Sequence, residues 1–158
     1  MYHDLNITTE EKTTLRNAVS WVTLLIAAAD GSIEEEELAW AEKITKIRGY
    51  NNPDKLSDFY DEVGKDFSEV LQAEIAALPT GQDAIKAHLS AKIETLNPIL
   101  AKMDKAAAFH YYKSYVTLAE HVAKSTGGFL RFFSVSVEEK KLMGLPMLQK
   151  IVYVEEES

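Results

Sequence analysis

Cysteine is absent from the 158-residue chain, and proline is scarce, with four residues. Without cysteine there is no disulfide framework, no thiolate zinc site and no iron–sulfur cluster. No stretch alternates between apolar and polar residues in the way that a half-buried β-strand does. The sequence therefore predicts an all-α fold, and its length suits a single domain, residues 1–158, with a sizeable core.

Basic residues are also in short supply. The chain has 17 lysines and arginines against 25 acidic residues, a formal net charge of −8, and residues 1–64 hold 13 of the acids and only 6 of the bases. A basic surface for phosphate backbones is missing, so we expect no nucleic-acid partner. The acidic half would instead attract cations or basic partners.

Long apolar runs are missing too, apart from one of moderate length. Residues 18–29 carry no charged side chain, yet a bilayer needs about 20 apolar residues, so no membrane insertion is expected. An uncharged helix belongs in the middle of a domain, which predicts that Trp21, Val22, Leu25 and Ile26 lie in the core. The amino terminus has no secretory pattern, and we expect a cytoplasmic location.

Start and stop signals divide the chain into seven to nine predicted helices. Serine or threonine followed three residues later by glutamate forms a capping box, and asparagine before proline marks a helix start. Glycines mark the predicted ends. A predicted apolar stripe continues along the second helix, and a tryptophan from each of the first two helices is expected to anchor the core. The capping boxes are Thr8–Glu11, Ser32–Glu35 and Ser136–Glu139, and the asparagine starts are Asn52 and Asn97. The predicted breaks lie at Gly49, Gly64 and Gly127. The stripe of the second helix consists of Leu38, Ala41, Ile44 and Ile47, and the two tryptophans are Trp21 and Trp40.

An acidic corner follows the uncharged run. Asp30 and Gly31 predict a tight turn, and four consecutive glutamates at 34–37 begin the next helix. Its spacing matches the second half of an EF-hand calcium loop, but the first half would place Ile26 and Ala28 at ligand positions, so it is not an EF-hand. Two interpretations stay open: a helix cap favoured by the helix dipole, or a cation site. For a site, the candidate ligands are Asp30, Glu34 and Glu37, since the two glutamates share a helix face.

The sequence AAADGSIEEEEL at this corner resembles the signature of TerB-like (tellurite resistance protein B-like) domains. A second resemblance lies in AKSTGGFLRFFSVSVEEKKL, at residues 123–142. Aligning Val135 with Ile33 places Glu139 where Glu37 stands, which predicts two degenerate helix-turn-helix halves at about 8–64 and 82–154. The second half lacks the Asp-Gly pair.

The resemblance implies an all-helical, non-enzymatic protein connected with tellurite resistance or stress. It also implies that clustered acids bind a metal, and by position it assigns Asp30, Glu37 and Glu139, whereas Glu34 follows from helix geometry. Oxygen ligands of this kind favour a weakly bound Ca²⁺, Mg²⁺ or Mn²⁺. No Glu-x-x-His pair typical of di-iron bundles occurs, and no G-x-S-x-G nucleophile turn is present.

The alternative function is a helical protein–protein interaction module without a metal site. Four large apolar side chains surround Arg131 directly after two glycines. Such a loop either fills the core or offers a surface to a partner, since large exposed apolar patches usually mark contacts. The candidate partner-binding residues are Phe129, Phe132 and Phe133.

Overall fold

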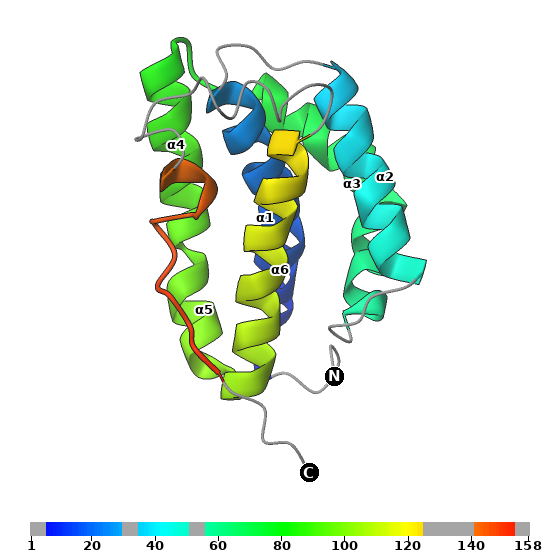
Figure 1. Cartoon of the computed structure of the whole chain (residues 1–158), viewed down its shortest axis with the longest axis vertical. Helices are drawn as coiled ribbons and strands as arrows, with labels where there is room; N and C mark the ends of the chain where they lie inside the picture. Colours follow the sequence, from blue (N-terminus) through cyan, green and yellow to red (C-terminus); the bar gives the residue numbers. More distant parts are fainter. Residues whose placement is uncertain (1–5, 30–34, 51–55, 125–140, 154–158) are drawn as a thin grey trace.

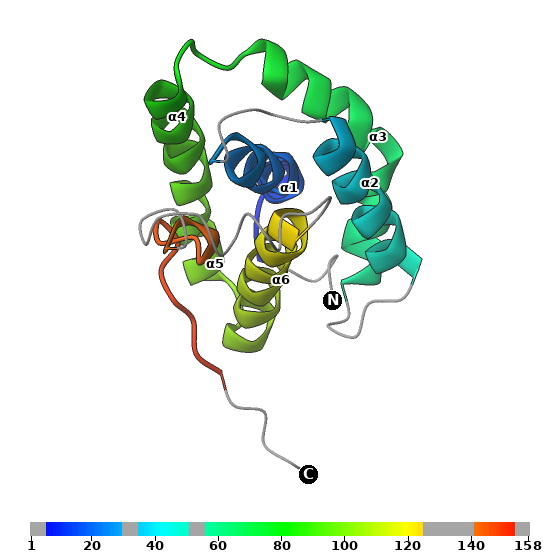
Figure 2. The same ribbon diagram turned by 45° about the horizontal axis from the view of Figure 1, so that its top comes forward.

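A central helix surrounded by five others organises the computed structural model (Figures 1 and 2). The structure describes residues 6–29, 35–50, 56–124 and 141–153. Within these ranges there are helices and no strands, which confirms the all-α prediction. The helices are α1 (Thr9–Ala29), α2 (Glu35–Tyr50), α3 (Ser57–Ala76), α4 (Gln82–Glu94), α5 (Leu96–Lys102) and α6 (Lys105–Lys124).

The amino-terminal end of α1 is fixed by the predicted capping box. The Thr8 N–H donates to Glu11 Oε1 at 2.9 Å, and the Glu11 N–H donates to Thr8 Oγ1 at 3.1 Å. These reciprocal bonds satisfy two of the donors that a helix start leaves free. Glu11 also accepts a bond from Lys102 Nζ at 2.8 Å, which ties the start of α1 to the end of α5.

The middle of α1 is buried as predicted. Trp21, Val22, Leu25 and Ile26 are at most 6% exposed, and every residue from Ala18 to Ala28 is buried. Thr23, one of the polar side chains in this run, donates to the carbonyl of Val19 at 2.8 Å and so needs no water. α1 contacts each of the other five helices, which explains why its surface is apolar on nearly every side.

The second predicted helix differs from α2 in two respects. Ala41 and Ile44 are buried and Leu38 is half-buried, but Ile47 is 53% exposed, so the predicted stripe ends one turn early. The helix also continues past Gly49 to Tyr50. The predicted anchor Trp21 is buried, whereas the side chain of Trp40 lies outside the described part.

The predicted break at Gly64 lies within two residues of a kink between two helical segments. One helix, α3, runs through this glycine and is kinked at Asp66, where φ is −134° and ψ is 17°. Gly64 lies two residues earlier, and its weak helix propensity accounts for a distortion nearby. The merging of two predicted segments is one reason why the count of seven to nine helices is not confirmed, since the described residues hold six. The start at Asn52 and the box Ser136–Glu139 lie outside the described residues.

Asn97 does not cap a helix, contrary to prediction. It is the second residue of α5, and Thr95 is the residue before that helix. Pro98 fits at the third position because the first turn of a helix has no internal partner for its N–H groups. The Asn97 side chain instead binds residues near the carboxyl terminus, as described below.

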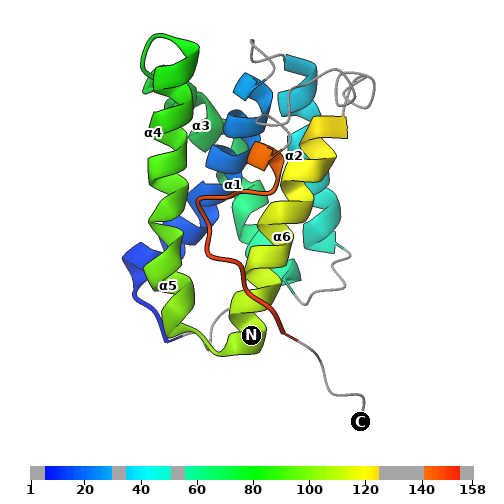
Figure 3. The same ribbon diagram turned by 60° about the vertical axis from the view of Figure 1, so that its left-hand side comes forward.

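The carboxyl-terminal residues cross α5 and α6 as an extended segment (Figure 3). We refer to residues 147–153 as the strap. A helical turn at 141–143 precedes it, and Leu145, in the left-handed region with φ of 52°, is fully buried. Leu142 and Leu148 are also buried, so three leucines anchor this end of the chain in the common core.

Candidate functional site

The predicted cation site falls at the junction of α1 and α2. Asp30, Glu34 and Glu139 lie outside the described residues, and the side chain of Glu37, within α2, is not described either. The structure therefore leaves open whether these four carboxylates meet. Among the residues that it does describe, no cluster of three or more histidines and carboxylates suits a metal ion.

α1 ends at Ala29, which directly precedes this corner in the sequence. No basic residue lies in the last turn of α1, so no charge within that turn offsets the negative end of the helix dipole. The side-chain amide of Gln82, at the start of α4, donates to the carbonyls of Ala28 and Ala29 at 3.4 and 3.5 Å. These are long, weak contacts, and the amide is neutral. The end of α1 is thus electrostatically suited to a nearby cation.

The apolar loop with Phe129, Phe132 and Phe133 lies outside the described residues, so the partner-binding surface predicted there stays a prediction. No helix in the described ranges is long and apolar enough to cross a membrane.

Several tyrosines place hydroxyl groups inside the core. Tyr60, in α3, shares a short hydrogen bond with Ser114 in α6, and both side chains are buried. Tyr115 donates to the carbonyl of Leu15 in α1 at 2.7 Å. These bonds fix the positions of three core helices, because a misplaced helix would leave a buried hydroxyl unpaired. Ser114 was not predicted from the sequence, although its place among the apolar residues of α6 was a usable signal.

A lysine connects α1, α3 and α4. Lys92 Nζ, in α4, lies 3.0 Å from Glu74 Oε2 of α3 and 5.4 Å from the centre of the Trp21 ring. The glutamate side chain is only 14% exposed, so the ion pair is partly shielded from water. A cation over an indole face is favourable, and this contact covers the buried tryptophan. The arrangement therefore stabilises the fold.

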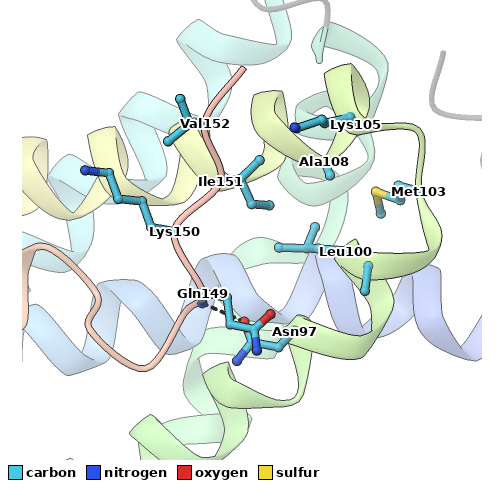
Figure 4. A pocket seen from close by; sticks show the side chains of 10 residues that line it. Asn97, Leu100, Met103, Lys105, Ala108, Gln149, Lys150, Ile151 and Val152 are labelled. Atoms are coloured by element: carbon cyan, nitrogen blue, oxygen red, sulfur yellow. Dashed lines mark hydrogen bonds between the residues drawn. The ribbon is translucent and has the colours of Figure 1, made fainter. Parts of the chain in front are cut away.

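A groove lies between two walls (Figure 4). One wall is the strap, and the other is formed by the end of α5 together with the start of α6. Its volume is about 450 Å³, within the range of ligand-binding pockets. The groove is lined by Asn97, Leu100, Ala101, Met103, Lys105, Ala108, Gln149, Lys150, Ile151 and Val152. The groove was not predicted from the sequence, because its two walls lie about 50 residues apart in the chain.

Asn97 holds the strap in place at one end of this groove. Its Nδ2 donates to the carbonyl of Met147, and its Oδ1 accepts from the N–H of Gln149, both at 2.9 Å. The second of these bonds is drawn in Figure 4. A single amide thus satisfies one acceptor and one donor of an extended segment, in the manner of a neighbouring strand.

Comparisons of the chain with protein-family models, with curated proteins and with solved structures gave no match. The resemblance to TerB-like domains therefore rests on the two sequence motifs alone.

Proposed function

We propose that this protein is a non-enzymatic, cytoplasmic, TerB-like protein that binds a divalent cation at the corner between α1 and α2, in a stress-response or tellurite-resistance setting. Asp30, Glu34 and Glu37 would supply the ligands, and Glu139 would complete the site from the second motif. Oxygen ligands favour Ca²⁺, Mg²⁺ or Mn²⁺ over copper.

The observation that carries this proposal is the environment of the end of α1. The helix ends with no basic residue in its last turn, and among the described residues a neutral amide, from Gln82, contacts its final carbonyls. The sequence then places five carboxylates among the next eight residues, 30–37. The negative end of a helix dipole and concentrated carboxylates both favour a cation.

The position of α1 gives such a site a means of affecting the rest of the molecule. Because α1 contacts all five other described helices, a cation that orders its last turn would act on the helix around which the core is built. Stabilisation follows from binding to the folded chain alone, and it grows with cation concentration above the dissociation constant. Three carboxylates without a complete calcium loop leave several positions to water, so affinity is expected at about 10⁻⁴–10⁻³ M.

The test is a titration of the full chain with CaCl₂ or MnCl₂, followed by NMR. Amide signals of residues 30–37 are expected to shift with Ca²⁺ or broaden with Mn²⁺, and the response should disappear in a variant with Asp30→Asn and Glu37→Gln. The matched control is Asp61→Asn with Glu69→Gln, which removes the same charge from two exposed positions of α3. A double variant at the corner that binds like the wild type, or a titration that has not saturated by about 10 mM, well above the expected range, would refute the proposal.

The competing proposal, an interaction module without a metal site, is supported by the apolar sequence around Arg131. If Phe132 faces a partner, Phe132→Ser should abolish association and leave the melting temperature nearly unchanged. A large loss of stability in this variant would place the side chain in the core and count against the module.

A further inference from the structure

We propose that the groove beneath the strap binds an extended acidic segment of a partner protein, with a large apolar side chain inside the groove and carboxylates at its lysines. None of the residues that line the groove belongs to the acidic corner, and the proposal does not depend on cation binding.

The interior of the groove suits an apolar side chain. Leu100, Met103 and Ala108 are buried residues that form its floor, and Ile151 points from the strap toward them (Figure 4). A volume of about 450 Å³ exceeds what one aromatic or branched side chain fills, so part of the neighbouring backbone would also fit. Apolar anchors in such pockets usually supply most of the binding energy of an interface.

The charge of the groove is opposite to that of the chain. The whole protein carries −8, yet the ten lining residues include Lys105 and Lys150 and no carboxylate. Neither lysine forms an ion pair with another residue in the described ranges, whereas the adjacent Lys102 is paired with Glu11. Asp104, the nearest carboxylate in sequence, is exposed and does not line the groove. Two lysines that form no ion pair with a described residue favour an acidic ligand and disfavour a basic one.

The strap gives the partner a backbone to pair with. Between Lys150 and Val152 the chain is extended, and its backbone groups form no hydrogen bond with other described residues. The side chains alternate, since Ile151 is half-buried and faces the groove while Lys150 and Val152 are exposed. Extended segments with free backbone groups bind peptides by strand addition, which favours a peptide over a compact small molecule.

The experiment measures fluorescence anisotropy of two labelled hexapeptides, EEVFEE and KKVFKK, with the full chain. The acidic peptide should bind and the basic peptide should not, and binding should weaken as salt screens the charges. Changing Lys105→Glu and Lys150→Glu together should lower affinity about tenfold or more. The control pair Lys46→Glu and Lys86→Glu makes the same change in net charge at exposed positions of α2 and α4 and should have little effect.

A steric variant tests the apolar part of the site. Ala101 is exposed and lines the groove, so Ala101→Trp should occupy the space and reduce binding about tenfold without unfolding the chain. Ala91→Trp, at an exposed position of α4, is the matched control. Circular dichroism and the melting temperature of each variant confirm that the fold is intact.

Four results would overturn the proposal: equal binding of both peptides, no binding of the acidic peptide at about 1 mM, equal losses in the two lysine pairs, or equal losses in the two tryptophan variants. Saturable binding of octanoate that depends on Lys105, without peptide binding, would assign the groove to small acids instead. Self-association of the chain that Ala101→Trp abolishes would assign it to a second copy.

Discussion

Asn97 Oδ1 accepts a hydrogen bond from the backbone N–H of Gln149 at 2.9 Å, across 52 residues of sequence. Asn97 Nδ2 also donates a hydrogen bond to the carbonyl of Met147. The Asn97 side chain therefore holds the strap through two hydrogen bonds. The strap forms a wall of the groove, so the shape of the groove depends on Asn97.

Replacement of Asn97 should therefore loosen the strap. Asn97→Ala removes one partly buried and one exposed hydrogen bond, and we expect a loss of about 1–2 kcal/mol in the free energy of unfolding. Hydrogen exchange at the amide of Gln149 should accelerate, while exchange in the middle of α1 changes only as far as global stability changes. Gln72→Ala, which removes an exposed amide of α3, is the control. Equal exchange at Gln149 in both variants would contradict this role.

Asn97 also shows why part of the fold could not be predicted from the sequence. Asparagine before proline is a local signal for a helix start, but here the amide pairs with a segment about 50 residues away. The prediction that Ile47 is buried failed for a similar reason. Periodicity placed it on the apolar stripe, but it could not show whether another segment covers that end of the helix. Local features were predicted well: the Thr8–Glu11 box and the burial of α1 both depend on residues close in sequence.

The two candidate sites also differ in how far they could be predicted from local sequence. The acidic corner is a contiguous sequence feature and was predicted as a candidate, although its side chains lie outside the described residues. The groove joins α5 and α6 to the strap, and only tertiary packing brings these segments together. Periodicity and capping signals describe single elements, so they do not predict which distant segments pack against one another.

The effects of removing the Tyr60 and Ser114 hydroxyl groups on stability should depend on each other. Tyr60→Phe or Ser114→Ala alone removes one partner of a buried hydrogen bond and leaves the other unsatisfied, at about 1–3 kcal/mol. The double variant should cost less than the two single changes together, with a coupling energy of about 0.5–3 kcal/mol. Urea denaturation of the wild type and the three variants measures it. Additive losses would show that the two hydroxyl groups do not depend on each other.

The burial of α1 predicts a large effect of a single core change. Leu25 is 1% exposed, and Leu25→Ala should lower the free energy of unfolding by about 2–5 kcal/mol through lost burial and the resulting cavity. Ile47→Ala removes the same number of carbon atoms from a side chain that is 53% exposed, and its effect should stay within about 0.5 kcal/mol. Thermal or urea unfolding measures both. Similar losses at the two positions would place Ile47 in an interface or Leu25 outside the core.

The ion pair between Glu11 and Lys102 should make stability depend on pH. Lys102, by donating a hydrogen bond to Glu11, holds the pKa of that carboxyl below its ordinary value of 4.5, and the N–H of Thr8 acts in the same direction. A lowered pKa in the folded state means that folding favours the charged carboxylate. The resulting stabilisation is complete above pH 4.5 and is lost as the pH falls through the lowered value.

Glu11→Gln isolates this effect, because glutamine keeps an acceptor for the N–H of Thr8 and removes the charge that attracts Lys102. The variant should unfold at a lower urea concentration than the wild type at pH 7, and the difference should shrink as the pH falls below 4.5. It should also shrink in 1 M NaCl, since Lys102 is 52% exposed and salt screens the pair. Glu10→Gln, which changes an exposed neighbour without an ion pair to a described residue, is the control. A difference at Glu11 that persists unchanged at pH 3 would mean that packing, and not charge, links α1 to α5.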